Sequence, residues 1–163
     1  MFEAATIDAA TKPEFYRELA RQAASLLEGE RDAIANAANL ASLISTTLPD
    51  LNWAGFYFLR GAELVLGPFQ GKPACVRIAV GRGVCGAAVA KRQTMLVKDV
   101  HDFADHIACD SASQSELVVP LMRNGQVIGV LDLDSPKLAR FDADDQAGIE
   151  ALAAIYVAAS DKL

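Results

Sequence analysis

The segment LVVPLMRNGQVIGVLDL, residues 117–133, contains an Asn-Gly pair between two apolar runs. Asn124 and Gly125 accept the positive φ angles of a two-residue hairpin turn. The flanking runs therefore predict two antiparallel strands, at 117–123 and 126–133.

Two aspartates lie near the end of the second strand. Alternation places Asp132 and Asp134 on one face of the sheet. Two like charges at that spacing are unfavourable unless they are solvated, protonated or matched to a cation. The pair indicates either an acidic site or a solvated strand end, because Asp134-Ser135-Pro136 also has the composition of a turn.

The rest of the chain alternates between helical and strand periodicity. The pattern predicts helices at 13–27, 30–48, 84–91 and 141–161, further strands at 52–59, 63–69, 76–80 and 95–97, and a long polar loop over 99–116. It favours an α+β fold, in which helices pack around a mostly antiparallel sheet of about six strands. We expect residues 1–163 to form a single domain, with residues 1–28 as an N-terminal helical extension.

Composition narrows the classes of function. The 163 residues are 52% hydrophobic and 22% charged, with a net charge of -6. Nucleic-acid or anionic-membrane binding needs clustered cations, so neither is expected. Residues 1–20 carry charges that do not fit a secretory signal, and the longest apolar run, 151–159, is too short to span a bilayer. We therefore expect a cytoplasmic protein.

The three cysteines are Cys75, Cys85 and Cys109. In a reducing compartment an odd number of cysteines does not indicate a disulfide framework, which leaves burial, metal binding or redox chemistry. Cys85 lies in the first turn of a predicted helix, where the helix dipole favours a thiolate. Cys109 lies in the polar loop, where a thiol would be accessible.

Other constellations carry weaker signals. Trp53 and Tyr57 share one face of a predicted strand, which is most often a sign of core packing. His101, His106 and Cys109 offer zinc-binding side chains, but at no standard zinc spacing. The Gly-x-Gly-x-x-Gly at 81–86 lacks the βαβ context of a dinucleotide site.

Taken together, six segments make the chain resemble the free methionine-(R)-sulfoxide reductases, a single-domain family of the GAF fold. They are NWAGFY (52–57), LGPFQGK (66–72), GVCG (83–86), HIACD (106–110), SELVVP (115–120) and GVLDLDS (129–135). The resemblance implies a GAF-like catalytic domain with its N-terminal and C-terminal helices packed on one side of the sheet.

The resemblance also implies an activity, the reduction of free L-methionine (R)-S-oxide. It implies that Cys109 is the nucleophile, Cys75 the resolving cysteine and Cys85 an accessory cysteine. It places Glu116, Asp132, Asp134, Trp53 and Tyr57 in the substrate pocket. It further implies a homodimer regenerated by thioredoxin, and no cofactor or metal.

The chemistry of the residues agrees with this reading. Crowded carboxylates raise one another's pKa, and the resulting carboxylic acid can activate a sulfoxide oxygen for attack on sulfur by a thiolate. The residues alone leave open whether Cys75 or Cys85 resolves the sulfenic acid. A non-catalytic GAF module that binds a small molecule or senses redox state is the alternative function, and a zinc-binding protein is a third.

The hairpin register raises one difficulty for a shared acidic pocket. An ideal two-residue turn pairs Glu116 with Leu133, which places Glu116 on the face opposite Asp132 and Asp134. Either a bulge in the hairpin or a position of Glu116 in the loop before the strand would bring the three acids together, and Pro120 is a plausible marker for the bulge.

Overall fold

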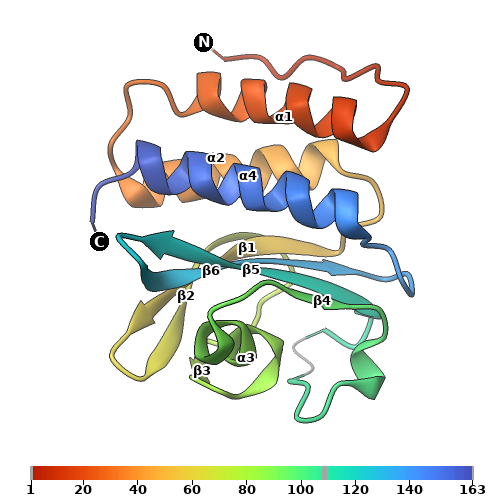
Figure 1. Ribbon diagram of the computed structural model, residues 1–163, viewed down its shortest axis with the longest axis vertical. Helices are drawn as coiled ribbons and strands as arrows, with labels where there is room; N and C mark the ends of the chain where they lie inside the picture. Colours follow the sequence, from red (N-terminus) through yellow and green to blue (C-terminus); the bar gives the residue numbers. More distant parts are fainter. Residues whose placement is uncertain (1, 108–109, 163) are drawn as a thin grey trace.

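The computed structural model describes residues 2–107 and 110–162. Within them lies a six-stranded sheet in the order β3-β2-β1-β6-β5-β4 (Figure 1), and each neighbouring pair of strands is antiparallel. The predicted α+β fold is therefore confirmed. No described helix has the length and hydropathy needed to cross a membrane.

Most elements lie within a few residues of their predicted bounds. The helices are α1 Lys12–Leu26, α2 Ala33–Thr47, α3 Gly83–Lys91 and α4 Ala143–Ala159, and the strands are β1 Trp53–Arg60, β2 Glu63–Gly71, β3 Arg77–Ala79, β4 Met95–Val97, β5 Ser115–Arg123 and β6 Gln126–Ser135. The predicted loop after β4 also contains a short 3-10 helix, Val100–Asp102.

Side-chain caps explain where three helices begin. Thr11 accepts a hydrogen bond from the Glu14 backbone N–H at the start of α1, and Asp32 does the same for Ala35 at the start of α2. Asp142 and Asp145 form a reciprocal capping box at α4. Such caps satisfy backbone donors that lack partners inside the helix.

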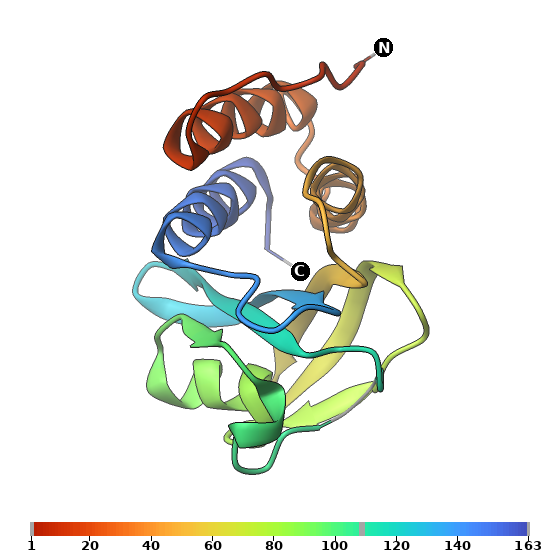
Figure 2. The ribbon, with the colours of Figure 1, turned by 90° about the vertical axis from the view of Figure 1, so that its right-hand side faces the viewer.

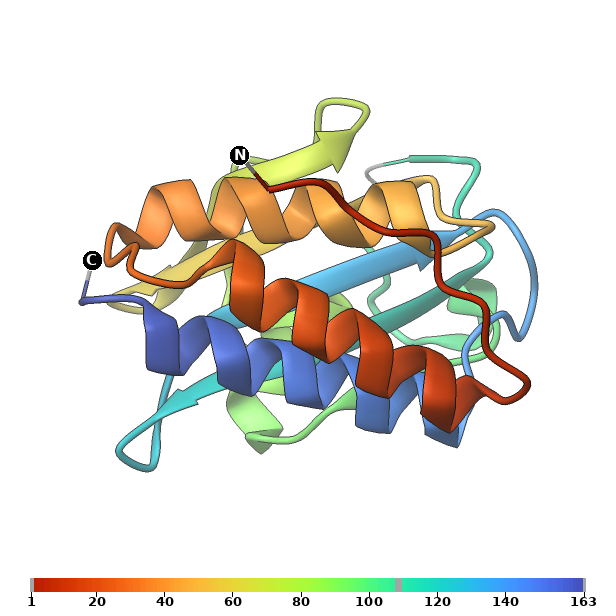
Figure 3. The same cartoon turned by 90° about the horizontal axis from the view of Figure 1, so that it is seen from above.

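The helices form two unequal layers around the sheet. Helices α2 and α4 cover one face, and α1 lies outside them, next to α4 (Figures 2 and 3). The N- and C-terminal helices thus lie on one side, as predicted. Helix α3 covers the opposite face (Figure 1).

Strand alternation separates two apolar cores. Phe56 and Phe58 of β1 belong to the larger core under α2 and α4. Trp53 and Tyr57 belong to the smaller one on the α3 side. This division follows from the two-residue period of a strand, and it leaves the α3 face free to carry a polar site.

The β5–β6 hairpin contains the irregularity that a shared acidic pocket needs. Near the turn Arg123 pairs with Gln126, but beyond Leu121 the register shifts by one residue, so that Glu116 pairs with Asp134. The extra residue is Ile128 of β6, opposite the Leu121–Met122 step. Of the two expected alternatives the bulge is the one observed, since Glu116 lies within β5. Pro120 as the marker of the bulge is wrong, since Pro120 pairs regularly with Val130.

The contact between α1 and α4 yields a stability prediction. A Cβ atom on Gly148 would lie 2.1 Å from the Tyr16 ring, and the Tyr16 hydroxyl donates a 2.7 Å hydrogen bond to Asp145. We expect Gly148→Ala to lower the free energy of unfolding by about 1–3 kcal/mol through overpacking. Chemical denaturation measures this change.

The sign of that change is diagnostic. Helix propensity alone would make Gly→Ala stabilising by up to about 1 kcal/mol. Ala151→Ser, at an exposed position of α4, serves as the control for a mild substitution in the same helix. An increase in stability for Gly148→Ala would contradict the close packing of α1 on α4.

Candidate active site

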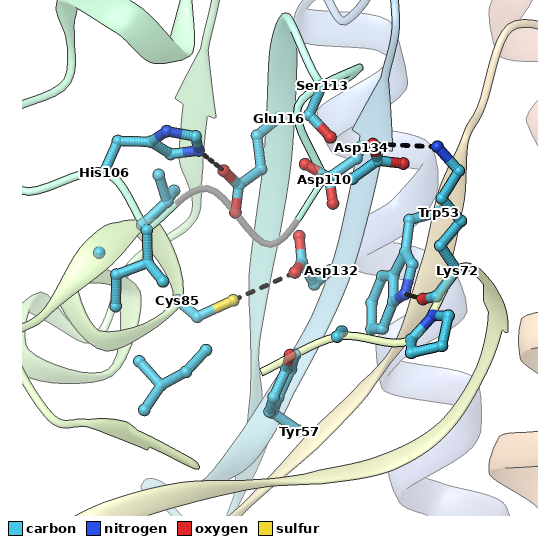
Figure 4. A pocket seen from close by; sticks show the side chains of 16 residues that line it. Trp53, Tyr57, Lys72, Cys85, His106, Asp110, Ser113, Glu116, Asp132 and Asp134 are labelled. Atoms are coloured by element: carbon cyan, nitrogen blue, oxygen red, sulfur yellow. Dashed lines mark hydrogen bonds and ion pairs between the residues drawn. The ribbon is translucent and has the colours of Figure 1, made fainter. Parts of the chain in front are cut away.

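A pocket opens on the α3 face of the sheet (Figure 4). Its walls come from β1, β5, β6 and α3 and from two connecting segments, one after β2 and one before β5. The side chains that the family resemblance singled out and that line it are Trp53, Tyr57, Cys85, Glu116, Asp132 and Asp134. The structure thus brings together six residues that lie up to 81 positions apart in the chain.

The three acids meet because of the strand register. Glu116 lies opposite Asp134 in the β5–β6 pair, and Asp132 lies next to them on β6. Glu116 and Asp132 are each 6% exposed. The Cys85 thiol donates a hydrogen bond to Asp132 Oδ2 at 3.2 Å, and His106 Nε2 lies 3.7 Å from Glu116 Oε2.

Burial dominates the electrostatics of these acids. It raises the pKa of Asp132 to about 6. It also raises the pKa values of Glu116 and Asp134 well above the ordinary range, and the negative charge of Asp132 adds to both shifts. Taking a carboxylate out of water favours its protonated form. The pocket therefore holds carboxylic acids that can donate a proton near neutral pH.

Cys85 differs from the expectation based on its helix position. Burial, followed by the charges of Asp132 and Glu116, raises the pKa of the Cys85 thiol well above its usual range. The predicted thiolate is therefore wrong for this state of the protein, because these effects outweigh the helix dipole. Cys85 is a free, buried thiol.

Aromatic side chains form the wall opposite Cys85 (Figure 4). Trp53 stacks on Tyr57, with ring centroids 5.9 Å apart, and on Phe69 at 5.3 Å. The Trp53 indole N–H donates to the Lys72 carbonyl at 3.2 Å, and the Tyr57 hydroxyl donates to the Cys75 carbonyl at 2.9 Å. The wall therefore anchors the segment that carries Cys75.

The structure describes one of the two cysteines that were predicted to form the redox pair. Cys75 is half-buried and disulfide-bonded. Cys109 lies outside the described residues. Of the alternative zinc trio, His106 lines the pocket, whereas His101 is exposed and pairs with Asp99 at 2.8 Å.

The sequence reasoning missed three polar residues at the pocket rim. Lys72, Asp110 and Ser113 all line the pocket. Lys72 Nζ lies 3.4 Å from Asp110 Oδ1, and the Asn52 amide donates to both Asp110 and Ser113. Lys72 is the last residue of the LGPFQGK segment and Asp110 is the last residue of the HIACD segment. Only the folded chain shows that these two segments meet.

Comparison with known proteins agrees with this geometry. Residues 13–159 match the GAF domain family. The free methionine-R-sulfoxide reductase of Escherichia coli is 54% identical over 143 residues, which cover 88% of this chain and 87% of that protein. The chain belongs to the free methionine-R-sulfoxide reductase family.

Further members of the free methionine-R-sulfoxide reductase family match over similar lengths. The Saccharomyces cerevisiae protein is 41% identical and covers 87% of this chain and 83% of its own length. The X-ray structure of the Neisseria meningitidis enzyme in complex with its substrate has a TM-score of 0.92 and 46% identity, covering 98% and 95% of the two chains. The GAF fold expected from the sequence is thereby confirmed.

The buried acids of this family member predict that stability depends on pH. The pKa of Asp132 is about 6 in the fold, against an ordinary value of 3.8. Above pH 3.8 the unfolded chain loses this proton while the fold retains it, so stability is lost as pH rises towards 6, and the full loss persists above 6. Asparagine cannot ionise and avoids the loss.

We therefore expect Asp132→Asn to raise the free energy of unfolding above pH 6 by up to about 3 kcal/mol. Below pH 4 the gain should vanish. Thermal or urea unfolding across pH 4–8 measures both limits, with exposed Asp144→Asn as control. A gain that does not depend on pH would count against a buried, protonated acid.

Proposed function

We propose that this chain reduces free L-methionine (R)-S-oxide to L-methionine. The observation that carries the proposal is the acidic pocket itself, where buried carboxyl groups with raised pKa values face a buried thiol and a wall of stacked aromatic rings. Membership in the free methionine-R-sulfoxide reductase family supports the same activity. The combination suits a neutral, polar sulfoxide group attached to a zwitterionic amino acid.

The reaction needs an acid as well as a nucleophile. A sulfoxide sulfur becomes electrophilic when its oxygen is protonated or strongly hydrogen-bonded. A carboxylic acid among Glu116, Asp132 and Asp134 supplies that proton. The Cys109 thiolate attacks the sulfoxide sulfur, and the protonated oxygen leaves as water. Attack of water on the Cys109 sulfur then breaks the new sulfur–sulfur bond, which releases methionine and leaves a Cys109 sulfenic acid.

The sulfenic acid then condenses with a second thiol. Cys75 attacks the Cys109 sulfur, a disulfide forms and water leaves. The placement of Cys75 beside the pocket, held through its carbonyl by Tyr57, supports this role. Cys85 is a weaker resolving candidate because burial and neighbouring carboxylates hold its thiol protonated.

Both charges of the free amino acid find partners at the pocket. A carboxylate among the acidic residues holds the ammonium group, and Lys72 holds the substrate carboxylate in place of Asp110. The Trp53–Tyr57 wall packs against the methyl-sulfur end. A methionine sulfoxide inside a peptide carries neither charge at these points, which accounts for a preference for the free amino acid.

The setting of the reaction follows from its chemistry. We propose that thioredoxin reduces the disulfide by thiol–disulfide exchange, and that the protein works in the cytoplasm, where thiols are kept reduced. We also propose a homodimer of single-domain chains. We further propose that residues 1–28 are an N-terminal helical extension of this domain, a role that the packing of α1 on α4 supports.

A single-turnover experiment tests the cysteine roles. We mix fully reduced protein with one equivalent of L-methionine (R)-S-oxide, without other reductant, and measure methionine and disulfides by mass spectrometry. The wild type should release one equivalent of methionine and form a Cys75–Cys109 disulfide. Cys109→Ser should release none, whereas Cys75→Ser should release methionine once and accumulate a sulfenic acid that dimedone traps.

The alternatives give different outcomes in the same experiment. A Cys85–Cys109 disulfide would keep the reaction but overturn the resolving role of Cys75. Equal yields from the S epimer would contradict a shaped pocket. No methionine and three intact thiols would favour the non-catalytic binding module.

Lys72→Met tests recognition of the substrate carboxylate. We expect kcat/KM for the free sulfoxide to fall about 10–100-fold, in line with loss of a charge-assisted hydrogen bond. For the uncharged amide of the same sulfoxide, kcat/KM should fall little. The ratio of kcat/KM for the acid to that for the amide should therefore decrease towards one. Lys72→Arg should retain most of the preference for the acid. An equal loss of kcat/KM on both substrates would contradict the role of Lys72 in binding the substrate carboxylate.

A further inference from the structure

Three donor atoms suited to a metal ion meet at the inner end of the pocket. The Cys85 sulfur and one carboxylate oxygen each from Glu116 and Asp132 all lie within 4.8 Å of one another, and all three residues are buried. These side chains come from α3, β5 and β6, so the fold itself sets their spacing. Of the two described histidines considered for zinc from the sequence, His106 lies beside this cluster and His101 does not.

One oxygen in the cluster lacks a partner. Among the described residues nothing donates a hydrogen bond to the buried Asp132 Oδ1. Its other oxygen accepts the Cys85 thiol at 3.2 Å. A buried carboxylate oxygen needs a proton or a cation, because water does not solvate it. A proton on Glu116 could satisfy it, and so could a metal ion bound between the two carboxylates.

The distances suit a small tetrahedral ion. Zinc binds sulfur at about 2.3 Å and carboxylate oxygen at about 2.1 Å, which places the two donors roughly 3.6 Å apart. The observed Cys85–Asp132 separation of 3.2 Å needs an adjustment of only a few tenths of an ångström. His106 Nε2 lies 3.7 Å from Glu116 Oε2, beside the cluster but not among its three donors, so a water molecule would complete a tetrahedral set.

The donor chemistry also selects the class of ion. One thiolate and two carboxylates suit a borderline, thiophilic divalent cation such as Zn²⁺. Magnesium and calcium prefer sites made of oxygen atoms alone. The aspartate and glutamate surroundings favour positive charge at this point, and Lys72 lies away at the rim.

We propose that Cys85, Glu116 and Asp132 form a binding site for a thiophilic divalent cation of the Zn²⁺ type, which excludes the substrate from the pocket. Binding forms metal–sulfur and metal–oxygen bonds and releases the Cys85 proton, and any proton on Glu116, to solvent. No residue changes oxidation state. The exclusion of substrate rests on the proposed function, whereas the metal site itself does not.

Cobalt(II) provides the probe, because thiolate coordination to it gives a ligand-to-metal charge-transfer absorption band. We titrate the reduced, metal-free wild type with Co²⁺ and expect one equivalent bound with that band. Zn²⁺ should abolish the band by displacement. Cys85→Ser should lack the band, and Glu116→Gln and Asp132→Asn should each weaken binding at least tenfold.

Cys75→Ser is the matched control, since it removes a thiol that the proposed site does not use. It should bind Co²⁺ as the wild type does. Circular dichroism and thermal unfolding check that each variant is folded, and Cys85→Ala replaces Cys85→Ser if the serine variant is not. In the Cys109→Ser chain, which cannot turn over, saturating L-methionine (R)-S-oxide should shift the Co²⁺ titration to higher concentration.

Several results would overturn the proposal. They are the absence of the band in the wild type, a band that survives in folded Cys85→Ser, and loss of the band in Cys75→Ser. Cobalt binding that substrate does not weaken would overturn the exclusion alone. A separate activity assay of the metal-free wild type tests the proposed reductase, so failure of either proposal is recognised independently.

Discussion

The extra residue at Ile128 decides which face of the sheet receives Glu116. Without it the β5–β6 pair would keep the register of the turn, and Glu116 would point towards the core under α2 and α4. A one-residue shift reverses the face of every side chain beyond it. The meeting of Glu116 with Asp132 and Asp134 on the pocket face follows from this single insertion in β6.

The two faces of the sheet bury different kinds of side chain. The face under α2 and α4 is packed with apolar side chains such as Phe56, Leu117 and Leu131. The other face buries Glu116 and Asp132 next to a thiol. Burying ionisable groups opposes folding, so the larger core supplies stability that the pocket lacks. Such local conflict is typical of functional sites.

Sequence reasoning predicted what local patterns control. Alternation placed Trp53 with Tyr57 and Asp132 with Asp134, and helical periodicity indicated where the four helices lie. It offered a bulge as one of two solutions but marked it at Pro120, because Ile128 has the composition of an ordinary strand residue. It predicted a thiolate at Cys85, where the thiol is protonated, and it missed Lys72. Both outcomes depend on segments that meet only in the folded chain.

Trp53 is the only tryptophan of the chain, and it lies in the pocket wall between Tyr57 and Phe69. All tryptophan fluorescence of the protein therefore originates beside the acidic cluster. Its indole N–H is also hydrogen-bonded to the backbone of the segment that leads to Cys75. The protein thus carries its own optical reporter, placed where ligand occupancy and changes near the redox segment alter the same signal.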